Sequence, residues 1–178
     1  MYLKKTIILF IAIIYTTSCS NQPDLAIFPF KTNTNSNKIQ GKAIKIADGD
    51  TFTILIEIAN NGGFIKERIR LNAIDAPEKK QPFSKKSKQF LSKLIFGKTV
   101  DIYYKKKDRY GRIIGDVYIG NLNVNYEMVK EGYAWHFKKY SDDQKLAELE
   151  NQARKQRKGL WQEKDPIPPW KWRKLIRK

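Results

Sequence analysis

The chain has 178 residues, of which 41% are hydrophobic and 12% aromatic, which indicates one domain with a packed core and excludes global disorder. Lys and Arg outnumber Asp and Glu by 35 to 18, and a net charge of +17 favours a polyanionic partner, either nucleic acid or an anionic membrane surface. One cysteine and one histidine exclude a disulfide framework and argue against a Cys/His zinc site. The chemistry must therefore rest on carboxylate, hydroxyl and guanidinium groups.

The first residues have the layout of an export signal. Two lysines precede an apolar run over residues 6–15, and three small residues lead up to Cys19. The run has ten residues, well short of the roughly 20 that cross a bilayer as a helix. Cys19 resembles the lipidated cysteine of bacterial lipoproteins, and the alternative is an ordinary cleaved signal with an unmodified Cys19. We expect residues 1–18 to be a signal peptide, whose removal takes away two lysines and no acid and leaves a net charge of +15.

The rest of the chain divides into three parts. Residues 19–37 are rich in Asn, Thr and Pro without a sustained period, so we predict a tether. Residues 38–170 are predicted to form one domain. Residues 171–178 form a basic tail, which is usually solvated charge.

The domain has the pattern of a β protein with helices. Residues 51–58 alternate apolar and polar side chains, which is typical of a half-buried strand, while residues 84–96 place apolar side chains at helical spacing. The fold class is therefore α+β, mainly β, and five strands in this order predict an OB-like Greek-key barrel with about three helices. The predicted elements are strands over 39–47, 51–58, 64–75, 99–105 and 112–119, and helices over 84–96, over 124–130 and after a capping box at 141–144.

Three short segments contain the residues suited to catalysis or ligand binding. They are DGDT at 48–51, RLNAIDAPE at 70–78 and DRYGR at 108–112. Each segment also has a plain structural interpretation, as a polar turn, a loop cap or a solvated strand residue. Arg70 and Asp75 are five residues apart and would face opposite sides of a regular strand, so a shared site requires a bulge or bend.

Taken together, these segments contain the parts of a phosphodiesterase. Asp50 and Asp75 offer hard oxygen ligands suited to Ca²⁺ or Mg²⁺. Arg70 and Arg112 can each donate forked hydrogen bonds to phosphate oxygens. Glu78 can take a proton from an attacking water. The set is consistent with metal-assisted phosphodiester hydrolysis.

The ordered motifs ADGDTF, RIRLNAIDAPE and KDRYGR, followed by GYAW and PIPPWKWR, resemble the staphylococcal nuclease (thermonuclease) family over roughly residues 39–173. The resemblance implies an OB-fold enzyme that cleaves DNA and RNA with Ca²⁺ and leaves 3′-phosphate ends. It also implies that Asp50 and Asp75 bind the metal through their carboxylates and Ala76 through its backbone carbonyl. Glu78 matches the general base of the family.

The remaining family positions concern the phosphate and the base. Arg70 and Arg112 match the arginines that stabilise the five-coordinate phosphorus. Arg109 and Tyr110 fall where family members contact a terminal phosphate, and Tyr140 aligns with a base-stacking tyrosine.

The chain departs from the family pattern near the base-stacking position, where Lys138 occupies the place of a second tyrosine. His136 lies in the same stretch, and we interpret it as structural or exposed. The loop after Glu78, at 79–83, is shorter than in the best-known member.

The sequence is also consistent with two other functions. One is a catalytically inactive OB module that binds nucleic acid. The other is a surface-attachment protein that uses its basic tail on polyanions or anionic lipid. Nothing in the sequence indicates an oligomer, so we expect a monomer. We also expect it to be exported and lipid-anchored to a bacterial membrane or cell surface, or else secreted.

Overall fold

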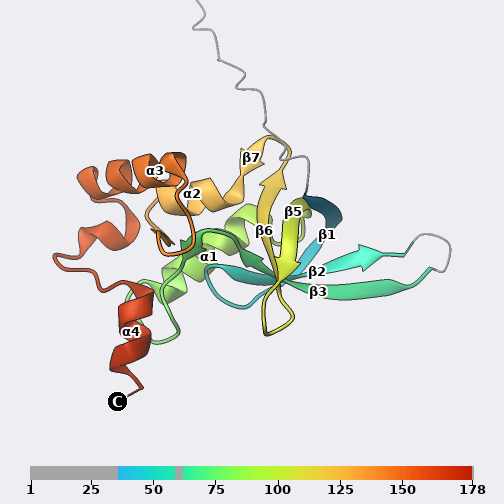
Figure 1. Ribbon diagram of the computed structural model, residues 1–178, viewed down its shortest axis with the longest axis horizontal. Coiled ribbons are helices and arrows are strands. Elements are labelled where there is room, and N and C mark those ends of the chain that lie inside the picture. Colours follow the sequence, from blue (N-terminus) through green and yellow to red (C-terminus); the bar gives the residue numbers. More distant parts are fainter. Residues whose placement is uncertain (1–35, 59–61, 178) are drawn as a thin grey trace, which may run out of the picture. The chain divides into compact units, whose positions relative to one another are not determined.

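The computed structural model describes residues 36–58 and 62–177 (Figure 1). The predicted signal peptide at 1–18, Cys19 and all but the last two residues of the predicted tether at 19–37 lie outside the described residues. In the described part of the chain, no helix is long and apolar enough to cross a bilayer.

Five strands close into a barrel, as the sequence predicts (Figure 1). They are β1 (Asn37–Ile46), β2 (Thr51–Glu57), β3 (Phe64–Leu71), β5 (Thr99–Lys107) and β6 (Ile113–Ile119). Their order is β3–β2–β1–β5–β6 with antiparallel neighbours, and a parallel pairing of β3 with β6 closes the ring. Closure pairs the last three residues of β3 with the start of β6, while the outer part of the β2–β3 hairpin extends beyond the barrel (Figure 1). The predicted OB-like α+β fold is confirmed.

Short strands and helices complete the domain. The described residues contain four α-helices and one 3₁₀ helix, where the sequence predicted about three helices. The additional α-helix, α4, includes the first residues of the predicted basic tail. The elements outside the barrel are β4 (Ile74–Asp75), α1 (Ser84–Ile95), β7 (Leu122–Asn123), α2 (Val124–Lys130), β8 (Trp135–His136), α3 (Gln144–Lys155), η1 (Gly159–Gln162) and α4 (Pro169–Leu175).

The predicted third strand over residues 64–75 is wrong in its last four residues. β3 ends at Leu71, and a turn with Ala73 at φ 61° leads into β4, which pairs with β8 and not with the barrel. The turn breaks the alternation of side chains along the strand. It therefore brings Arg70 and Asp75 together despite their odd spacing, and it is the bend that a shared site required.

Helix α3 begins later than the capping box at 141–144 predicts. Its N-cap is Asp143, whose carboxylate accepts hydrogen bonds from the backbone N–H groups of Lys145 and Leu146. Ser141 instead accepts a hydrogen bond from the backbone N–H of Asp143. An aspartate at this position stabilises a helix by about 1 kcal/mol relative to alanine.

The barrel interior is filled by inward-facing strand residues. Phe52 and Ile54 are completely buried, as the alternation over 51–58 predicts, and Ile69 and Ile102 meet them from other strands. Each such side chain contributes roughly 1.5–3 kcal/mol relative to an exposed position. This core holds the strand ends that carry the site.

A second, smaller core lies under the C-terminal part of the chain. Trp135 of β8 packs edge-on against Trp161 of η1, with ring centroids 4.3 Å apart, and against Trp170 of α4 at 5.6 Å. Ala153 and Leu160 complete this cluster. The cluster fixes α4 next to β8 and hence next to β4, which carries Asp75.

Candidate active site

A cavity of about 750 Å³ opens where the β1–β2 turn, the end of β3, the loop before β6 and α4 meet. The structure brings together the charged residues predicted from the three sequence segments. The predicted site side chains that line this cavity are Asp50, Arg70, Asp75, Glu78, Arg109, Tyr110, Arg112 and Tyr140.

Two buried carboxylates lie at the centre of the cavity. Asp50 is 6% exposed and Asp75 is 2% exposed. Arg70 lies between them, with Nη2 3.0 Å from Oδ2 of Asp50 and 3.0 Å from Oδ1 of Asp75. The backbone N–H of Ala76 donates to Oδ2 of Asp50 at 2.7 Å. The pair is therefore held close together by one shared guanidinium group.

The turn that carries Asp50 is packed tightly against helix α1. A Cβ atom on Gly49 would lie 1.9 Å from the Oγ of Ser87, so only glycine fits between turn and helix. The backbone carbonyl of Asp50 accepts a hydrogen bond from the N–H of Leu71 at 2.8 Å. These contacts position the Asp50 carboxylate relative to the end of β3.

The acidic residues of the cavity share a low-dielectric environment. Burial, followed by the negative charge of Asp50, raises the pKa of Asp48 to about 7. Burial also raises the pKa of Asp75 above its ordinary value, although hydrogen bonds from Arg173 oppose this shift. Crowded carboxylates in such a place favour a bound cation.

Arg112 is oriented by an aspartate from its own loop. Its Nε donates to Oδ2 of Asp108 at 2.8 Å, and its Nη1 lies 3.3 Å from Oγ1 of Thr51. Burial raises the pKa of Asp108, but hydrogen bonds from Arg112 and Tyr110 outweigh this effect and hold it below its ordinary value. These contacts hold the orientation of the Arg112 guanidinium group, which lines the cavity.

Arg109 and Tyr110 form an exposed pair at the cavity. Tyr110 is 62% exposed, and Nη2 of Arg109 donates to its hydroxyl at 2.7 Å. The guanidinium carbons of Arg109 and Arg112 lie 4.8 Å and 5.6 Å from the centroid of the Tyr110 ring. Such a pair offers positive charge and a hydroxyl to an incoming phosphate.

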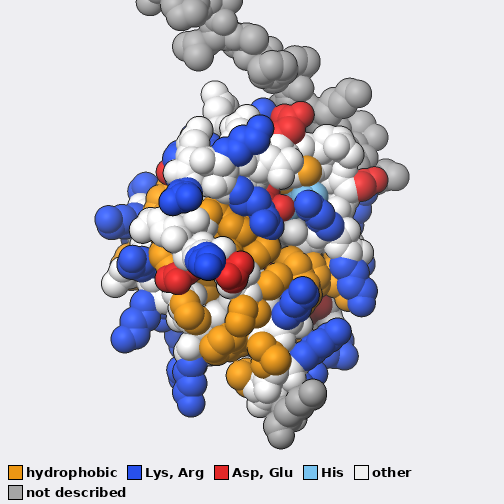
Figure 2. All heavy atoms as spheres, turned by 90° about the vertical axis from the view of Figure 1, so that its left-hand side faces the viewer, with side chains coloured by type: hydrophobic (Ala, Val, Ile, Leu, Met, Phe, Trp, Pro, Cys, Tyr) orange, Lys and Arg blue, Asp and Glu red, His pale blue; other side chains and the backbone are white. Residues whose placement is uncertain are grey.

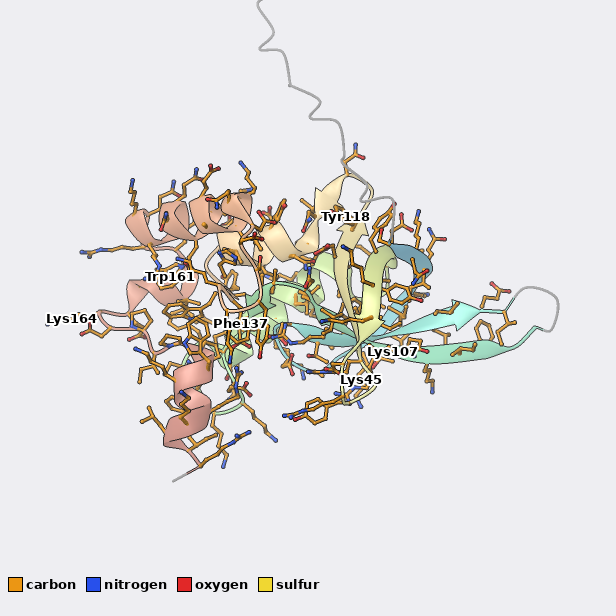
Figure 3. All side chains as sticks on the ribbon, viewed as in Figure 1. Lys45, Lys107, Tyr118, Phe137, Trp161 and Lys164 are labelled. Carbon is orange, nitrogen blue, oxygen red and sulfur yellow. The ribbon has the colours of Figure 1, made fainter. Side chains whose placement is uncertain are left out.

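Tyr140 is the exposed aromatic residue on the other side of the cavity. Its side chain is 70% exposed, and its ring packs edge-on against Phe137 with centroids 4.9 Å apart. Figure 3 places Phe137 between α4 and the barrel strands, where its ring stacks on that of Trp170 at 5.1 Å. The Nζ of Lys139 lies 5.5 Å from the centroid of the Tyr140 ring, so this supported and exposed ring combines an aromatic surface with positive charge, as base stacking next to a phosphate requires.

The sequence did not identify Arg173 as a site residue. From α4, its Nη2 lies 2.9 Å from Oδ2 of Asp75, and its Nη1 lies 3.2 Å from Oδ1 of the same residue. The Nη1 atom also donates to Oε1 of Glu78 at 2.5 Å. Burial lowers the pKa of Arg173, but its hydrogen bonds to Asp75 and Glu78 outweigh this effect and raise the pKa. Arg173 thus links the two carboxylates from the far end of the chain.

Gln81 is a second residue that the sequence did not reveal. Its Oε1 accepts a hydrogen bond from the backbone N–H of Glu78 at 3.0 Å, and its Nε2 donates to the carbonyl of Ile167 at 2.6 Å. The short loop at 79–83 is therefore tied to the segment that leads into α4. In the sequence, only the motif PIPPWKWR indicated that the segment around Pro168 matters, and nothing in its spacing connected that segment with Glu78.

The donor set of the acidic pair fits a hard cation such as Ca²⁺. Ca²⁺ takes carboxylate, backbone carbonyl and water oxygens, so Asp50, Asp75 and the carbonyl of Ala76 can supply part of its shell and water the rest. Among residues 36–58 and 62–177, no group of three or more His, Cys, Asp or Glu side chains could hold a metal. The protein therefore supplies few ligands to a metal at this place. Both oxygens of Asp75 also contact Arg173, so a cation bound to Asp75 would share this carboxylate with the guanidinium group.

His136 lies outside this chemistry, as the structural interpretation predicts. It is 3% exposed, and its Nε2 lies 3.2 Å from Oγ of Ser141. Its Nδ1 is buried without a hydrogen-bond partner among the described residues. Burial lowers the pKa of His136 below its ordinary value, which favours the neutral ring in the folded state.

Comparison with known proteins agrees with this geometry. A protein of Escherichia coli named an uncharacterized endonuclease is 43% identical over 150 residues, which cover 84% of this chain and 94% of the relative. An uncharacterized endonuclease of Haemophilus influenzae is 41% identical over 150 residues, covering 84% of this chain and 82% of the relative. The probable staphylococcal-like nuclease CAN2 of Oryza sativa subsp. japonica is 47% identical over 109 residues, 61% of this chain but 30% of that protein.

The family itself is found directly in the sequence. Residues 68–163 match the family described as staphylococcal nuclease homologue, and this segment includes Arg70, Asp75, Glu78 and Arg112. Asp50 precedes the matched segment, but it lies within hydrogen-bond distance of Ala76 in the same cavity. The chain therefore belongs to the staphylococcal nuclease family, a family of nucleic-acid hydrolases.

Proposed function

We propose that this nuclease is Ca²⁺-dependent, acts on both DNA and RNA, and leaves products with 3′-phosphate ends. The observation that carries the proposal is the convergence of two carboxylates, two arginines and a glutamate in one cavity. Each of these side chains has a direct use in phosphodiester hydrolysis.

Asp50, Asp75 and the backbone carbonyl of Ala76 are the groups that would hold Ca²⁺. Ca²⁺ bound there would neutralise charge on the phosphate and polarise its oxygens. The carboxylates already form ion pairs with Arg70 and Arg173, so the support for the assignment is their chemistry, since hard oxygen ligands placed close together suit Ca²⁺.

The arginines bind the phosphate and stabilise the charge that develops on it. Arg112 is oriented by Asp108, and Arg70 is oriented by the two buried carboxylates and by the carbonyl of Leu71. Preorganised donors of this kind act mainly on the transition state. They would contact the non-bridging oxygens as water attacks phosphorus.

Glu78 takes the proton of the attacking water. Its Oε1 accepts from Arg173, while its Oε2 takes no hydrogen bond from a described residue and is available to water. Attack at phosphorus with departure of the 5′-oxygen leaves the phosphate on the 3′ side. The proton goes from the attacking water to Oε2. The departing 5′-oxygen takes a proton from solvent water, and the hydroxide so formed removes the proton from Glu78.

Incubation of the purified protein with DNA and with RNA, in Ca²⁺ and in excess chelator, tests the proposal. Cleavage in Ca²⁺ alone, with 3′-phosphate ends on the products, is the expected result. Binding without cleavage would favour the inactive OB module instead. Attachment to anionic vesicles without either would favour the surface-attachment protein.

We also infer that the protein is exported, carries lipid on Cys19 and works as a monomer. The export layout of residues 1–18 and the position of Cys19 directly after them support the first two points. The predicted catalytic and metal-binding side chains all come from one chain, so no second copy is needed to complete the cavity.

A further inference from the structure

A second cavity of about 580 Å³ adjoins the active-site cavity on the side of α3 and α4. The two share four lining residues, Phe137, Tyr140, Arg173 and Arg177. They therefore form one continuous depression that begins at the buried carboxylates and runs out along α4. We call its outer part, lined by residues 135–140 together with Glu150, Arg154, Trp170, Lys174 and Arg177, the α4 groove.

The α4 groove is strongly basic. Its one acidic lining residue among the described residues is Glu150, whose carboxylate is already paired with Lys138 and Arg154, each at 3.4 Å. Lys139 and Lys174 are exposed and have no carboxylate partner in the described part of the chain. Figure 2, which faces the side of the molecule at the left of Figure 1, shows Lys and Arg side chains spread around a hydrophobic area.

The hydrophobic part of the α4 groove is aromatic. The rings of Phe137 and Trp170 stack with an interplanar angle of 9°, and Tyr140 stands edge-on to Phe137. The position is rigid, because Trp170 also packs against Trp135 in the second core. Supported aromatic faces between basic side chains are the two parts of a surface that binds single-stranded nucleic acid.

We propose that the α4 groove binds a single-stranded stretch of the substrate beyond the phosphodiester that is cleaved. Lys139 and Lys174 contact its phosphates, and Tyr140 stacks on a base at the entrance. The proposal rests on the proposed function, because the strand enters the groove from the active-site cavity.

Continuity and charge favour a polynucleotide over other anions. A strand that has one phosphate at Arg70 and Arg112 must leave the cavity, and the shared residues Tyr140 and Arg177 lie on the way into the α4 groove. An anionic lipid would use the positive charge but not the stacked rings within a recess. A single strand uses both and can bend into the groove more easily than a duplex.

The test measures binding in excess chelator, so that cleavage does not interfere. Fluorescence anisotropy compares single strands of about four and about sixteen nucleotides, the limits of the site sizes of OB-folds. The groove variant is Lys139→Glu/Lys174→Glu. The matched control is Lys42→Glu/Lys66→Glu, which makes the same charge change at two exposed strand residues that line neither cavity.

We expect the wild-type protein to prefer the long strand and the groove variant to lose most of that preference. The slope of log affinity against log salt concentration should fall by about 1.4 for the groove variant, because two phosphate contacts are removed. Tyr140→Ala should weaken the long strand roughly tenfold, while Tyr140→Phe retains binding. The control variant should keep the preference and the slope.

Each other outcome is informative about a different claim. A groove variant that keeps the long-strand preference would overturn the α4 groove as the binding path. Loss of binding to phosphatidylglycerol vesicles with unchanged strand binding would also overturn it and identify lipid as the occupant. The wild-type protein could prefer the long strand, and the groove variant lose that preference, while the wild-type protein cleaves nothing in Ca²⁺. That result would support strand binding in the α4 groove and refute the proposed function.

Discussion

The side chain of Arg173 donates a hydrogen bond to Glu78 across 95 positions of sequence, with Nη1 2.5 Å from Oε1. Arg173 comes from α4, whereas Glu78 lies in the loop before α1. The same guanidinium also spans both carboxylate oxygens of Asp75. The last helix of the chain therefore sets the position of the residue that we propose to accept the proton.

Replacement of Arg173 by Gln should destabilise the protein more in chelator than in Ca²⁺. Without the guanidinium, the buried Asp75 carboxylate has lost a charged partner, which costs roughly 1–3 kcal/mol. Bound Ca²⁺ would restore positive charge at the same carboxylate and offset part of the loss. Urea unfolding curves in both solutions measure the difference.

Lys174→Gln is the matched control for this measurement. It removes one positive charge from the same helix but no ion pair within the described residues, so its stability should change little. Equal destabilisation of Arg173→Gln with and without Ca²⁺ would contradict the assignment of Asp75 as a metal ligand.

Asp50→Asn and Asp75→Asn should each raise the Ca²⁺ concentration needed for half-maximal cleavage, by on the order of tenfold or more. An amide keeps one acceptor oxygen but loses the charge that binds a hard cation. Calorimetric titration with Ca²⁺ checks binding apart from catalysis. Undiminished cleavage by the wild-type protein in excess chelator would refute the calcium requirement.

Arg112→Ala and Glu78→Gln should lower kcat by roughly 10²-fold or more while leaving strand binding in chelator largely intact. Arg112→Lys should rescue poorly, because a point charge cannot reproduce the fork that Asp108 orients. Single-turnover rates, with unfolding curves for each variant, separate chemistry from stability. Wild-type rates in well-folded Glu78→Gln protein would end the proposed mechanism.

Arg70→Ala is expected to be the more complex variant. Its guanidinium contacts both buried carboxylates, so its loss should reduce stability as well as kcat. Partial recovery of stability in Ca²⁺, without recovery of kcat, is the expected pattern.

His136 should make the stability of the protein fall as the pH drops below about 6.5, the ordinary pKa of the unfolded side chain. Burial lowers the pKa of His136 in the fold, so the unfolded state binds the proton more tightly. Acidification therefore stabilises the unfolded state relative to the folded state. Glu150 and Asp143 attract the proton and Lys138 opposes it, but burial has the larger effect. His136→Gln should flatten this part of the stability curve between pH 7 and 5, measured by thermal unfolding.

Cys19 is expected to be the lipidated first residue of the mature protein in its native host. Mass spectrometry of the mature N-terminus should show a mass increase on Cys19 that corresponds to several acyl chains, because one chain gives only marginal membrane binding. An unmodified Cys19, or cleavage at another residue, would refute the lipid anchor.

The barrel was predictable because its signals are local. Alternation over residues 51–58 buries Phe52 and Ile54, and β2 occupies Thr51–Glu57. The helical spacing over 84–96 similarly matches α1. Period and turn residues identify such elements because each pattern lies within the segment that it describes.

The contribution of α4 was not predictable in this way. The helix has seven residues, begins with Pro169 and is held by packing between Trp170 and Trp135. Such a short segment has little helical stability of its own, so tertiary contacts determine its structure. For the same reason, no local pattern connects Arg173 with Glu78.

The parallel pairing of β3 with β6 has a consequence for how activity arises during folding. Ile69 and Ile113, which pair across this closure, are distant in sequence, and contacts of this kind form slowly because a long loop must first be ordered. The pairing also brings the end of β3, with Arg70, next to the strand that follows Arg112. A chain with an open barrel therefore holds Arg70 and Arg112 apart. We therefore expect nuclease activity to appear only after the ring has closed.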